Sequence, residues 1–204
     1  MISTGWMLPA CVLALLGCLR YAWTTATGHS RPNLVTWGIW ATVPTLAFAA
    51  QVSDGVGLPA ALTLMAGLGP AVVVATALAT RRFYARCTRL DQVCAALAAA
   101  ALVGWLTVGS PVTAILLSIA ADALALVPTA VKAWRDPGSE DAGFFVAIAA
   151  AATITLFTLS RWSIASSAFA LYQLAACVVL AAVIVLRGRS GRVRSFSGGN
   201  RPGR

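Results

Sequence analysis

Long apolar stretches alternate with short polar segments along almost the whole chain. Seven of these stretches approach the roughly 20 residues that a helix needs to cross the hydrocarbon core of a bilayer. The predicted spans are Trp6–Ala26, Leu34–Val52, Leu58–Ala79, Gln92–Val108, Pro111–Ala130, Gly143–Leu159 and Ile164–Leu186. A tight turn at Gly109, Ser110 and Pro111 separates the fourth span from the fifth. The pattern predicts an all-α integral membrane protein with seven transmembrane helices.

Basic residues concentrate in every second gap between these spans. The gaps after the first, third and fifth spans, with the segment after the seventh, hold 13 of the 15 Lys and Arg residues. Arg20 lies within the first span, and Arg161 alone occupies the opposite gaps. The excess of basic residues in cytoplasmic loops predicts an outside N-terminus and a cytoplasmic C-terminus in a plasma (bacterial inner) membrane. Fusing the fourth and fifth spans would put the basic third gap and the basic tail on opposite sides, which favours seven spans over six.

The composition excludes a water-soluble enzyme. Of the 204 residues, 59% are hydrophobic and only 10% are charged, whereas roughly a quarter of an ordinary soluble domain is charged. The net charge of +9 lies in the gaps between spans, so it indicates topology and not nucleic-acid binding. The segment Arg187–Arg204 is rich in Gly, Ser and Arg, and we expect a disordered cytoplasmic tail. This tail either sets the topology alone or also binds anionic lipids.

The residues needed for most catalytic or cofactor chemistry are missing. The chain has one His and five Cys with no CxxC pair, so we expect no metal site, no cofactor and no catalytic group. The last span contains no Lys, which excludes a retinal Schiff base. Cys18 follows Leu15–Gly17 as in a lipoprotein cleavage site, but residues 1–10 carry no basic residue. A permanent first helix is the better interpretation.

The two halves of the chain carry similar features at an offset of 105 residues. Matching positions include Thr24 with Thr129, Pro32 with Pro137, and Arg82 with Arg187. The offset predicts two three-helix repeats that enter the membrane in the same direction, related by an axis along the membrane normal. The predicted units are residues 1–80 (first repeat), 81–109 (basic loop and linker helix), 110–186 (second repeat) and 187–204 (tail).

Two segments carry a resemblance to a known family. Residues Gly28–Trp40 read GHSRPNLVTWGIW, and residues Asp122–Thr129 read DALALVPT. With the three-one-three order of spans and the outside N-terminus, they resemble the first-to-second helix junctions of the SWEET and PQ-loop superfamily of small-solute transporters. The resemblance implies a fold of two parallel three-helix bundles joined by a linker helix. It also implies transport by alternating access.

The chain departs from this family at two kinds of position. The Pro-Gln pair that ends the first helix of each repeat in the family is Trp23-Thr24 in the first repeat and Pro128-Thr129 in the second. The third span of each repeat lacks the Asn and Trp that sugar-carrying members place there; Tyr172 and Gln173 are the nearest substitutes. These departures argue against a sugar as the solute.

Asp122 is the residue most indicative of function. It lies eight residues before the predicted inner end of the fifth span, at a depth of roughly 12 Å. Carboxylates at such depth usually face a bundle interior, a partner or an aqueous path. Arg20 is the predicted partner because its side chain should lean toward the membrane centre. The alternatives are a protonated Asp122 bonded between helices and an Arg20 that extends to the lipid head groups.

Further polar, aromatic and proline residues are candidates for a solute path and its moving parts. Asn33 and Trp40 are predicted at an inner gate, and Tyr172 and Gln173 along the path. The tryptophans near inner span ends (Trp23, Trp37, Trp40 and Trp134) also fit an interfacial belt. Prolines inside predicted spans can act as hinges or be static: they are Pro44, Pro70 and Pro128.

The sequence therefore predicts a multi-pass transporter or facilitator of an unidentified small polar solute. The alternative is a non-transporting membrane scaffold or assembly protein, for which the loops and the basic tail would be docking elements. A solute path containing Asp122 and Gln173 would favour transport. A tightly packed centre with an exposed docking face would favour the scaffold.

Overall fold

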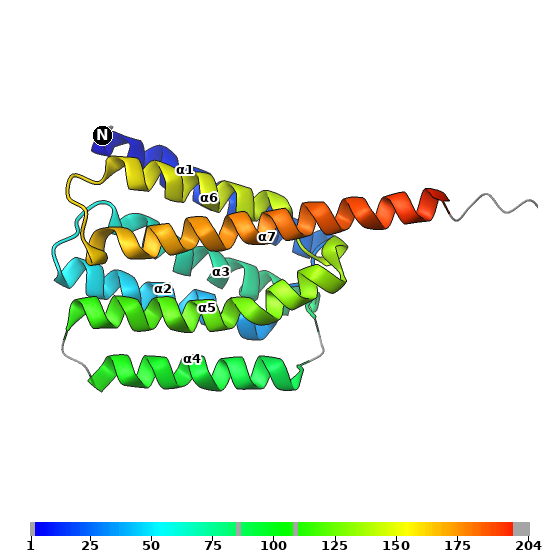
Figure 1. The fold of residues 1–204 in the computed structure, drawn as a ribbon, viewed down its shortest axis with the longest axis horizontal. Helices are drawn as coiled ribbons and strands as arrows, with labels where there is room; N and C mark the ends of the chain where they lie inside the picture. Colours follow the sequence, from blue (N-terminus) through cyan, green and yellow to red (C-terminus); the bar gives the residue numbers. More distant parts are fainter. Residues whose placement is uncertain (1–2, 85–86, 108–109, 198–204) are drawn as a thin grey trace, which may run out of the picture.

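The computed structural model describes residues 3–84, 87–107 and 110–197. All regular secondary structure in these ranges is helical (Figure 1). Two single-turn 3-10 helices, η1 (Thr4–Trp6) and η2 (Pro137–Ser139), accompany the seven α-helices. The α-helices are α1 (Met7–Thr27), α2 (Leu34–Ser53), α3 (Ala60–Thr80), α4 (Arg89–Thr107), α5 (Pro111–Arg135), α6 (Ala142–Thr158) and α7 (Ile164–Ser197).

Six of these helices pack as a closed ring, with the seventh outside it. Each ring helix contacts two neighbours, in the order α1, α3, α2, α5, α7, α6 and back to α1. Helix α4 packs on the outer side of α5 with a smaller contact to α2, and it lies at the edge of the bundle (Figure 1). The core therefore lies inside the six-helix ring, and any internal site must be built from those helices.

Four of the described helices are long and apolar enough to cross a bilayer, which indicates a membrane-embedded helical protein. They are Met7–Thr27, Ala60–Thr80, Pro111–Arg135 and the first 25 residues of α7. Helix α6 is apolar but shorter, with 17 residues. The predicted spans coincide with seven helices, and the crossing of the membrane by all seven stays a prediction.

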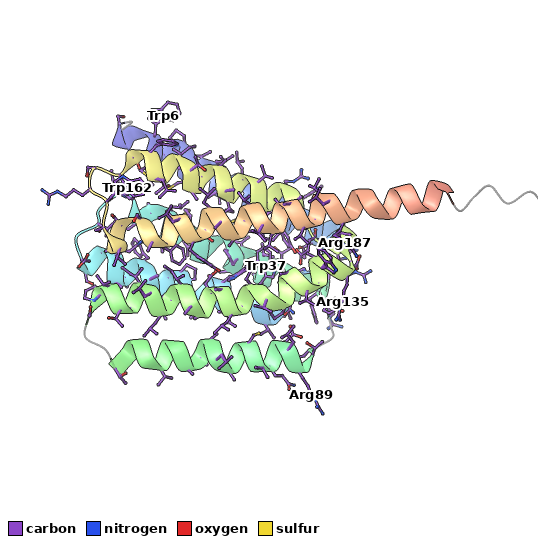
Figure 2. All side chains as sticks on the ribbon, viewed as in Figure 1. Trp6, Trp37, Arg89, Arg135, Trp162 and Arg187 are labelled. Atoms are coloured by element: carbon purple, nitrogen blue, oxygen red, sulfur yellow. The ribbon has the colours of Figure 1, made fainter. Side chains whose placement is uncertain are left out.

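The two ends of the bundle differ in charge. Arg89, Arg135 and Arg187 lie at one end, and Trp6 and Trp162 lie at the other (Figure 2). We call the first the basic end; it carries the α1–α2, α3–α4 and α5–α6 connections and the C-terminal part of α7 (Figure 1). The other is the opposite end. Exposed tryptophans at both ends are typical of the two interfaces of a membrane.

Two helices continue beyond their predicted ends. Helix α5 extends to Arg135, so Lys132 and Arg135 lie in its last turn and not in a loop. Helix α7 extends past Leu186 to Ser197, into the first part of the predicted tail. Residues 198–204 lie outside the described ranges, and the disorder of the tail stays a prediction. Arginine is a good helix former, and an established helix adds one hydrogen bond for each further residue. Apolar length thus marked the membrane portion of each helix and missed its polar extension.

Side-chain caps and one close approach fix the helix positions. Asn33 caps α2 by accepting a hydrogen bond from the backbone N–H of Val35 at 3.0 Å. Asp141 caps α6 through the N–H of Gly143 at 2.9 Å. Both caps satisfy N–H groups that a helix start leaves free. Gly17 lets α1 approach α6 closely, because a Cβ there would lie 2.8 Å from the Cβ of Ala147.

Candidate functional site

Asp122 lies near the middle of α5 and faces an internal cavity. Its residue is only 4% exposed. The cavity measures about 30 Å³, which is room for a water molecule or two. All six ring helices line it and α4 does not. Its lining residues other than Asp122 are Cys18, Trp40, Ala66, Pro70, Leu126, Phe144, Phe145, Ile148, Tyr172, Gln173, Ala176, Cys177 and Leu180.

Asp122 has direct partners on two other helices. The hydroxyl of Tyr172 on α7 donates a hydrogen bond to the Asp122 carboxylate at 2.6 Å. The indole N–H of Trp40 on α2 reaches the backbone oxygen of Asp122 at 3.4 Å. Gln173, next to Tyr172, also lines the cavity. The structure thus brings together four of the predicted path residues, and they surround one carboxylate.

The ion pair predicted between Arg20 and Asp122 is wrong. The guanidinium of Arg20 instead contacts Asp141 at the start of α6, with Nε 2.8 Å from one carboxylate oxygen and a second hydrogen bond of 3.2 Å to the other. The Arg20 side chain is 60% exposed. Its long side chain reaches the polar end of the bundle, where a charge is solvated at lower cost than beside the central cavity.

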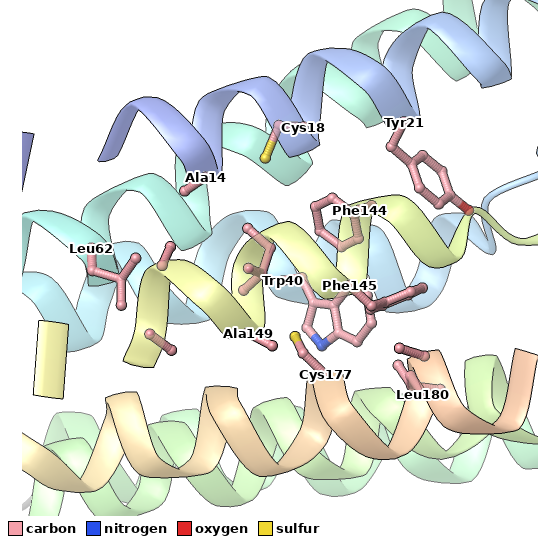
Figure 3. Close-up of a cluster of buried hydrophobic side chains, with 14 of the residues drawn as sticks. Ala14, Cys18, Tyr21, Trp40, Leu62, Phe144, Phe145, Ala149, Cys177 and Leu180 are labelled. Carbon is pink, nitrogen blue, oxygen red and sulfur yellow. The ribbon is translucent and has the colours of Figure 1, made fainter. Parts of the chain in front are cut away.

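Aromatic side chains separate the cavity from the basic end. Tyr21 and Trp37 are fully buried, and their ring centroids lie 4.2 Å apart. Phe144 packs edge-on against Tyr21 at 5.4 Å, and Phe145 packs against Trp40 at 6.4 Å. Figure 3 shows Tyr21, Trp40, Phe144 and Phe145 in this cluster, with Cys18 and Cys177 beside it. We call Tyr21, Trp37, Trp40, Phe144 and Phe145 the aromatic layer.

A buried charged cluster closes the bundle beyond the aromatic layer. Lys132 on α5 forms an ion pair with Glu140 at 2.7 Å, and both side chains are almost fully buried. The Tyr21 hydroxyl donates to the other oxygen of Glu140 at 2.5 Å. Lys132 also donates to the backbone oxygen of Arg31. This charged cluster (Lys132, Glu140 and Tyr21) joins α1, α5, the α1–α2 loop and the α5–α6 connection.

Asn33 lies outside the cavity and serves a different contact. Its side-chain N–H donates to Asp91 at the start of α4 at 2.5 Å. Thr88 donates two further hydrogen bonds to the Asp91 carboxylate, both 2.6 Å long. Asp91 precedes the predicted fourth span; burial by itself would raise the pKa of Asp91, but these hydrogen bonds stabilise the charged form and lower it. Asn33 therefore attaches α4 to the ring and is not placed to contact a solute at Asp122.

Two tryptophans expected in the interfacial belt are internal. Trp37 is fully buried and Trp40 is 7% exposed. Trp23 and Trp134, which were also expected in the belt, are 71% and 55% exposed at the basic end. Trp23 lies four residues before the end of α1, and Trp37 lies three residues after the start of α2. Position near a span end therefore did not distinguish the two groups. Trp37 is buried because it lies on the face of α2 that packs against Tyr21 and Phe144.

The three predicted hinge prolines lie inside continuous helices. Pro44 is in α2, Pro70 in α3 and Pro128 in α5, and all three are buried. Pro70 lines the cavity. Proline supplies no backbone N–H, so each helix lacks one internal hydrogen bond at these points, and α5 bends in its C-terminal part (Figure 1). A bend is compatible with a hinge and with a static helix.

Sequence reasoning missed two cysteines at the cavity. Cys18 and Cys177 both line it, although neither was a candidate for the solute path. A signal for Cys177 was present, because Gln173, Cys177 and Leu180 are spaced by four and three residues and so share one face of α7. A signal for Cys18 was also present, because Tyr21 and Thr25 lie three and seven residues further along α1 and share its face.

The opposite end is closed by apolar residues and backbone contacts. A cluster of small side chains from α2, α5 and α7 packs there, consisting of Ala50, Ala114, Ile115 and Ala165. Gln51 is 2% exposed and donates to the backbone oxygen of Ala165 at 3.1 Å. The two charged residues in the loops at this end, Asp54 and Arg161, are exposed.

Comparison with known proteins adds no relative to this picture. No family model matches the chain, and neither a curated protein nor a solved structure shows significant similarity to it. Across the ranges that the structure covers, no group of three or more His, Cys, Asp and Glu side chains is arranged to hold a metal ion. The site is therefore described by its own chemistry: a carboxylate, a phenol and an amide around a small cavity inside six helices.

Proposed function

We propose that the protein is a membrane transporter or facilitator that moves a small polar solute by alternating access. The observation that carries this proposal is the cavity inside the six-helix ring, into which Asp122, Tyr172 and Gln173 bring polar groups. A carboxylate far from both ends of a membrane helix is costly unless it has a function or a partner. At about 30 Å³ the cavity is too small for a sugar, so the proposal requires the halves to separate before a solute enters.

The order of helices around the ring supports two parallel repeats. We matched the helices of the two repeats: α1 with α5, α2 with α6 and α3 with α7. Under this match every contact between ring neighbours corresponds to another contact between ring neighbours. The contact of α1 with α6, for example, becomes that of α5 with α2. This is the pattern expected of a three-one-three fold whose halves are related by an axis along the membrane normal. In the proposal α4 is the linker helix, all seven helices cross the membrane, and the basic end is cytoplasmic.

The layers between the cavity and the basic end would form the inner gate. In the proposed inward-open state the aromatic layer separates, and the ion pair between Lys132 and Glu140 breaks or exchanges partners. Rocking of one half against the other requires elements with two stable arrangements. The prolines of α2, α3 and α5 provide points at which the helices lack a hydrogen bond and can bend.

One observation favours the scaffold as the second candidate. The cavity is small and the centre is otherwise well packed, whereas large apolar side chains are exposed around the bundle, including Leu8, Phe157 and Leu186. Lipid contact explains such exposure in a membrane protein, so this observation is weaker than the polar cavity. A non-transporting protein should keep the cavity closed to water-soluble reagents.

The two cavity cysteines make this distinction measurable. In a full-length variant with Cys11→Ala, Cys87→Ser and Cys94→Ala, only Cys18 and Cys177 remain. A small, charged, membrane-impermeant thiol reagent applied to the protein in lipid vesicles should label Cys177 if the cavity opens to water. A matched variant that also carries Cys177→Ala separates its signal from that of Cys18. Absence of labelling under native conditions, with full labelling after unfolding, would support the scaffold.

A ligand screen then tests the role of Asp122. A solute that binds only the folded protein stabilises it by mass action, by about 2.7 kcal/mol at a concentration one hundred times its Kd. We expect one class among sugars, amino acids, vitamins and nucleosides to raise the thermal stability of the wild type, to protect Cys177 and to lose both effects with Asp122→Asn. A ligand that acts equally on the wild type and on Asp122→Asn would remove Asp122 from the site.

A further inference from the structure

A groove lined by three arginines opens at the basic end, away from the cavity. It lies where the end of α1 and the α1–α2 loop meet the end of α3, and its volume is about 410 Å³. Its lining residues are Thr27, Gly28, Arg31, Arg81, Arg82 and Phe83. We call it the arginine groove. Among the described residues, neither the proposed solute path nor the basic tail contributes one to it.

The three arginines have no acidic partner. All six acidic residues of the chain lie in the described ranges, and none lines the groove or comes within 4.0 Å of these guanidinium groups. Glu140 pairs with Lys132, and Asp141 pairs with Arg20. Asp91 is held by Thr88 and Asn33. The groove therefore concentrates positive charge that the rest of the protein leaves uncompensated.

Two unusual backbone positions lie beside or within this set of arginines. Gly28 ends α1 with φ of 85°, and a Cβ there would overlap Nη1 of Arg82. The guanidinium of Arg82 thus lies directly against the backbone of Gly28. Arg81 ends α3 in the left-handed region with φ of 53°, the one non-glycine residue with positive φ among the residues described. Glycine is the usual residue at such a cap, so the arginine is present despite a backbone cost, which points to a use for its side chain.

We propose that the arginine groove binds the phosphate of an anionic phospholipid from the leaflet at the basic end. Guanidinium groups bind phosphate oxygens through paired, charge-assisted hydrogen bonds. The groove lies one helical turn beyond the exposed Trp23 on α1, at the level expected for lipid head groups. Phe83 supplies a partly buried apolar side to the same groove. Basic pockets at this level of a membrane bundle suit phospholipid head groups.

This inference does not depend on transport, because it rests on a different part of the protein. The experiment uses the full chain in detergent and measures retained lipid by native mass spectrometry and stabilisation by thermal shift. Phosphatidylglycerol is the anionic probe, phosphatidylcholine the neutral lipid, and glycerol phosphate the soluble phosphate. We expect phosphatidylglycerol to bind and to stabilise the wild type more than the other two.

Charge-removing variants then locate the binding. Arg31→Gln with Arg82→Gln should weaken phosphatidylglycerol binding by about 25-fold, at about fivefold for each arginine. Arg161→Gln at the opposite end removes the same kind of charge and should leave the affinity unchanged. Equal binding by wild type and the double variant would assign the lipid to the basic tail and overturn the proposal. Binding of glycerol phosphate as strong as that of the lipid would overturn it in favour of a soluble phosphate compound.

Arg81→Gly separates lipid binding from folding. Glycine adopts positive φ without steric cost, so this variant should melt at the same or a higher temperature than the wild type in neutral detergent. Its affinity for phosphatidylglycerol should nevertheless fall about fivefold. A variant that keeps wild-type affinity would show that Arg81 takes no part in binding, and would contradict the three-arginine site.

Discussion

The two ends of the bundle are closed by different kinds of interaction. At the basic end, Lys132, Glu140 and the Tyr21 hydroxyl form a buried charged cluster above the aromatic layer. At the opposite end, alanines and Ile115 pack together, and Gln51 contributes a side-chain hydrogen bond to the backbone. Lys132 and Glu140 are buried, whereas the charged residues of the opposite loops, Asp54 and Arg161, are exposed.

This difference has a physical consequence for how each end responds to substitution. A buried ion pair costs several kcal/mol of desolvation for each ion and is held by a few strong, directional contacts. When such contacts separate, water or other polar groups can replace them. An apolar contact between small side chains has no replacement partner and depends on shape over its whole area. Substitutions of charge should therefore disturb the basic end most, and substitutions of volume should disturb the opposite end.

Glu140→Ala is the substitution with the largest expected effect. It leaves Lys132 buried without its partner and removes the acceptor of the Tyr21 hydroxyl, so we expect a loss of about 3–5 kcal/mol in the free energy of unfolding. Chemical or thermal unfolding of the purified protein in one detergent measures this loss. Glu140→Ala combined with Lys132→Met removes the isolated charge and should recover most of the stability. If the double variant is as unstable as the single one, the unpaired lysine is not the cause.

Gln51→Ala tests the opposite end with a smaller expected effect. It removes the side-chain hydrogen bond to the Ala165 backbone oxygen, an acceptor within the first turn of α7, and should cost about 0.5–1.5 kcal/mol in the free energy of unfolding. No charged group loses its partner in this variant, so the loss of stability should not depend on salt concentration. A loss for Gln51→Ala greater than that for Glu140→Ala, measured in the same way, would reverse the proposed difference between the ends.

Arg20→Ala should have the smallest effect, although Arg20 belongs to the same end as Glu140. Its side chain is 60% exposed, and exposed ion pairs usually contribute about 0.2–1 kcal/mol. Arg20 and Asp122 share no partner, so the effects of Arg20→Ala and Asp122→Ala on stability should add to within about 0.5 kcal/mol. A larger deviation from additivity in the double variant would show that Arg20 and Asp122 interact, and would contradict the structure.

The sequence predicted what depends on local pattern and missed what depends on contacts between distant segments. Each predicted span overlaps one helix, because a long apolar stretch directly marks the part of a helix that suits a membrane. The position of Asp122 in the interior followed from the cost of an isolated carboxylate at that depth. The contact between Tyr21 and Glu140 joins residues 119 positions apart and depends on the order of helices in the ring, which no local pattern encodes. Arg20 was assigned the wrong carboxylate for the same reason.

Helix α4 contacts α5 and the edge of α2, and it contributes no residue to the cavity. Two halves that run in the same direction need an odd number of crossings between them, and one helix is the smallest number that meets this need. In a protein built as we propose, α4 carries the chain back across the membrane once. The second half then begins on the same side as the first. Mutations on its outer face should then accumulate freely provided that it stays apolar and helical, whereas its deletion would invert the second half in the membrane.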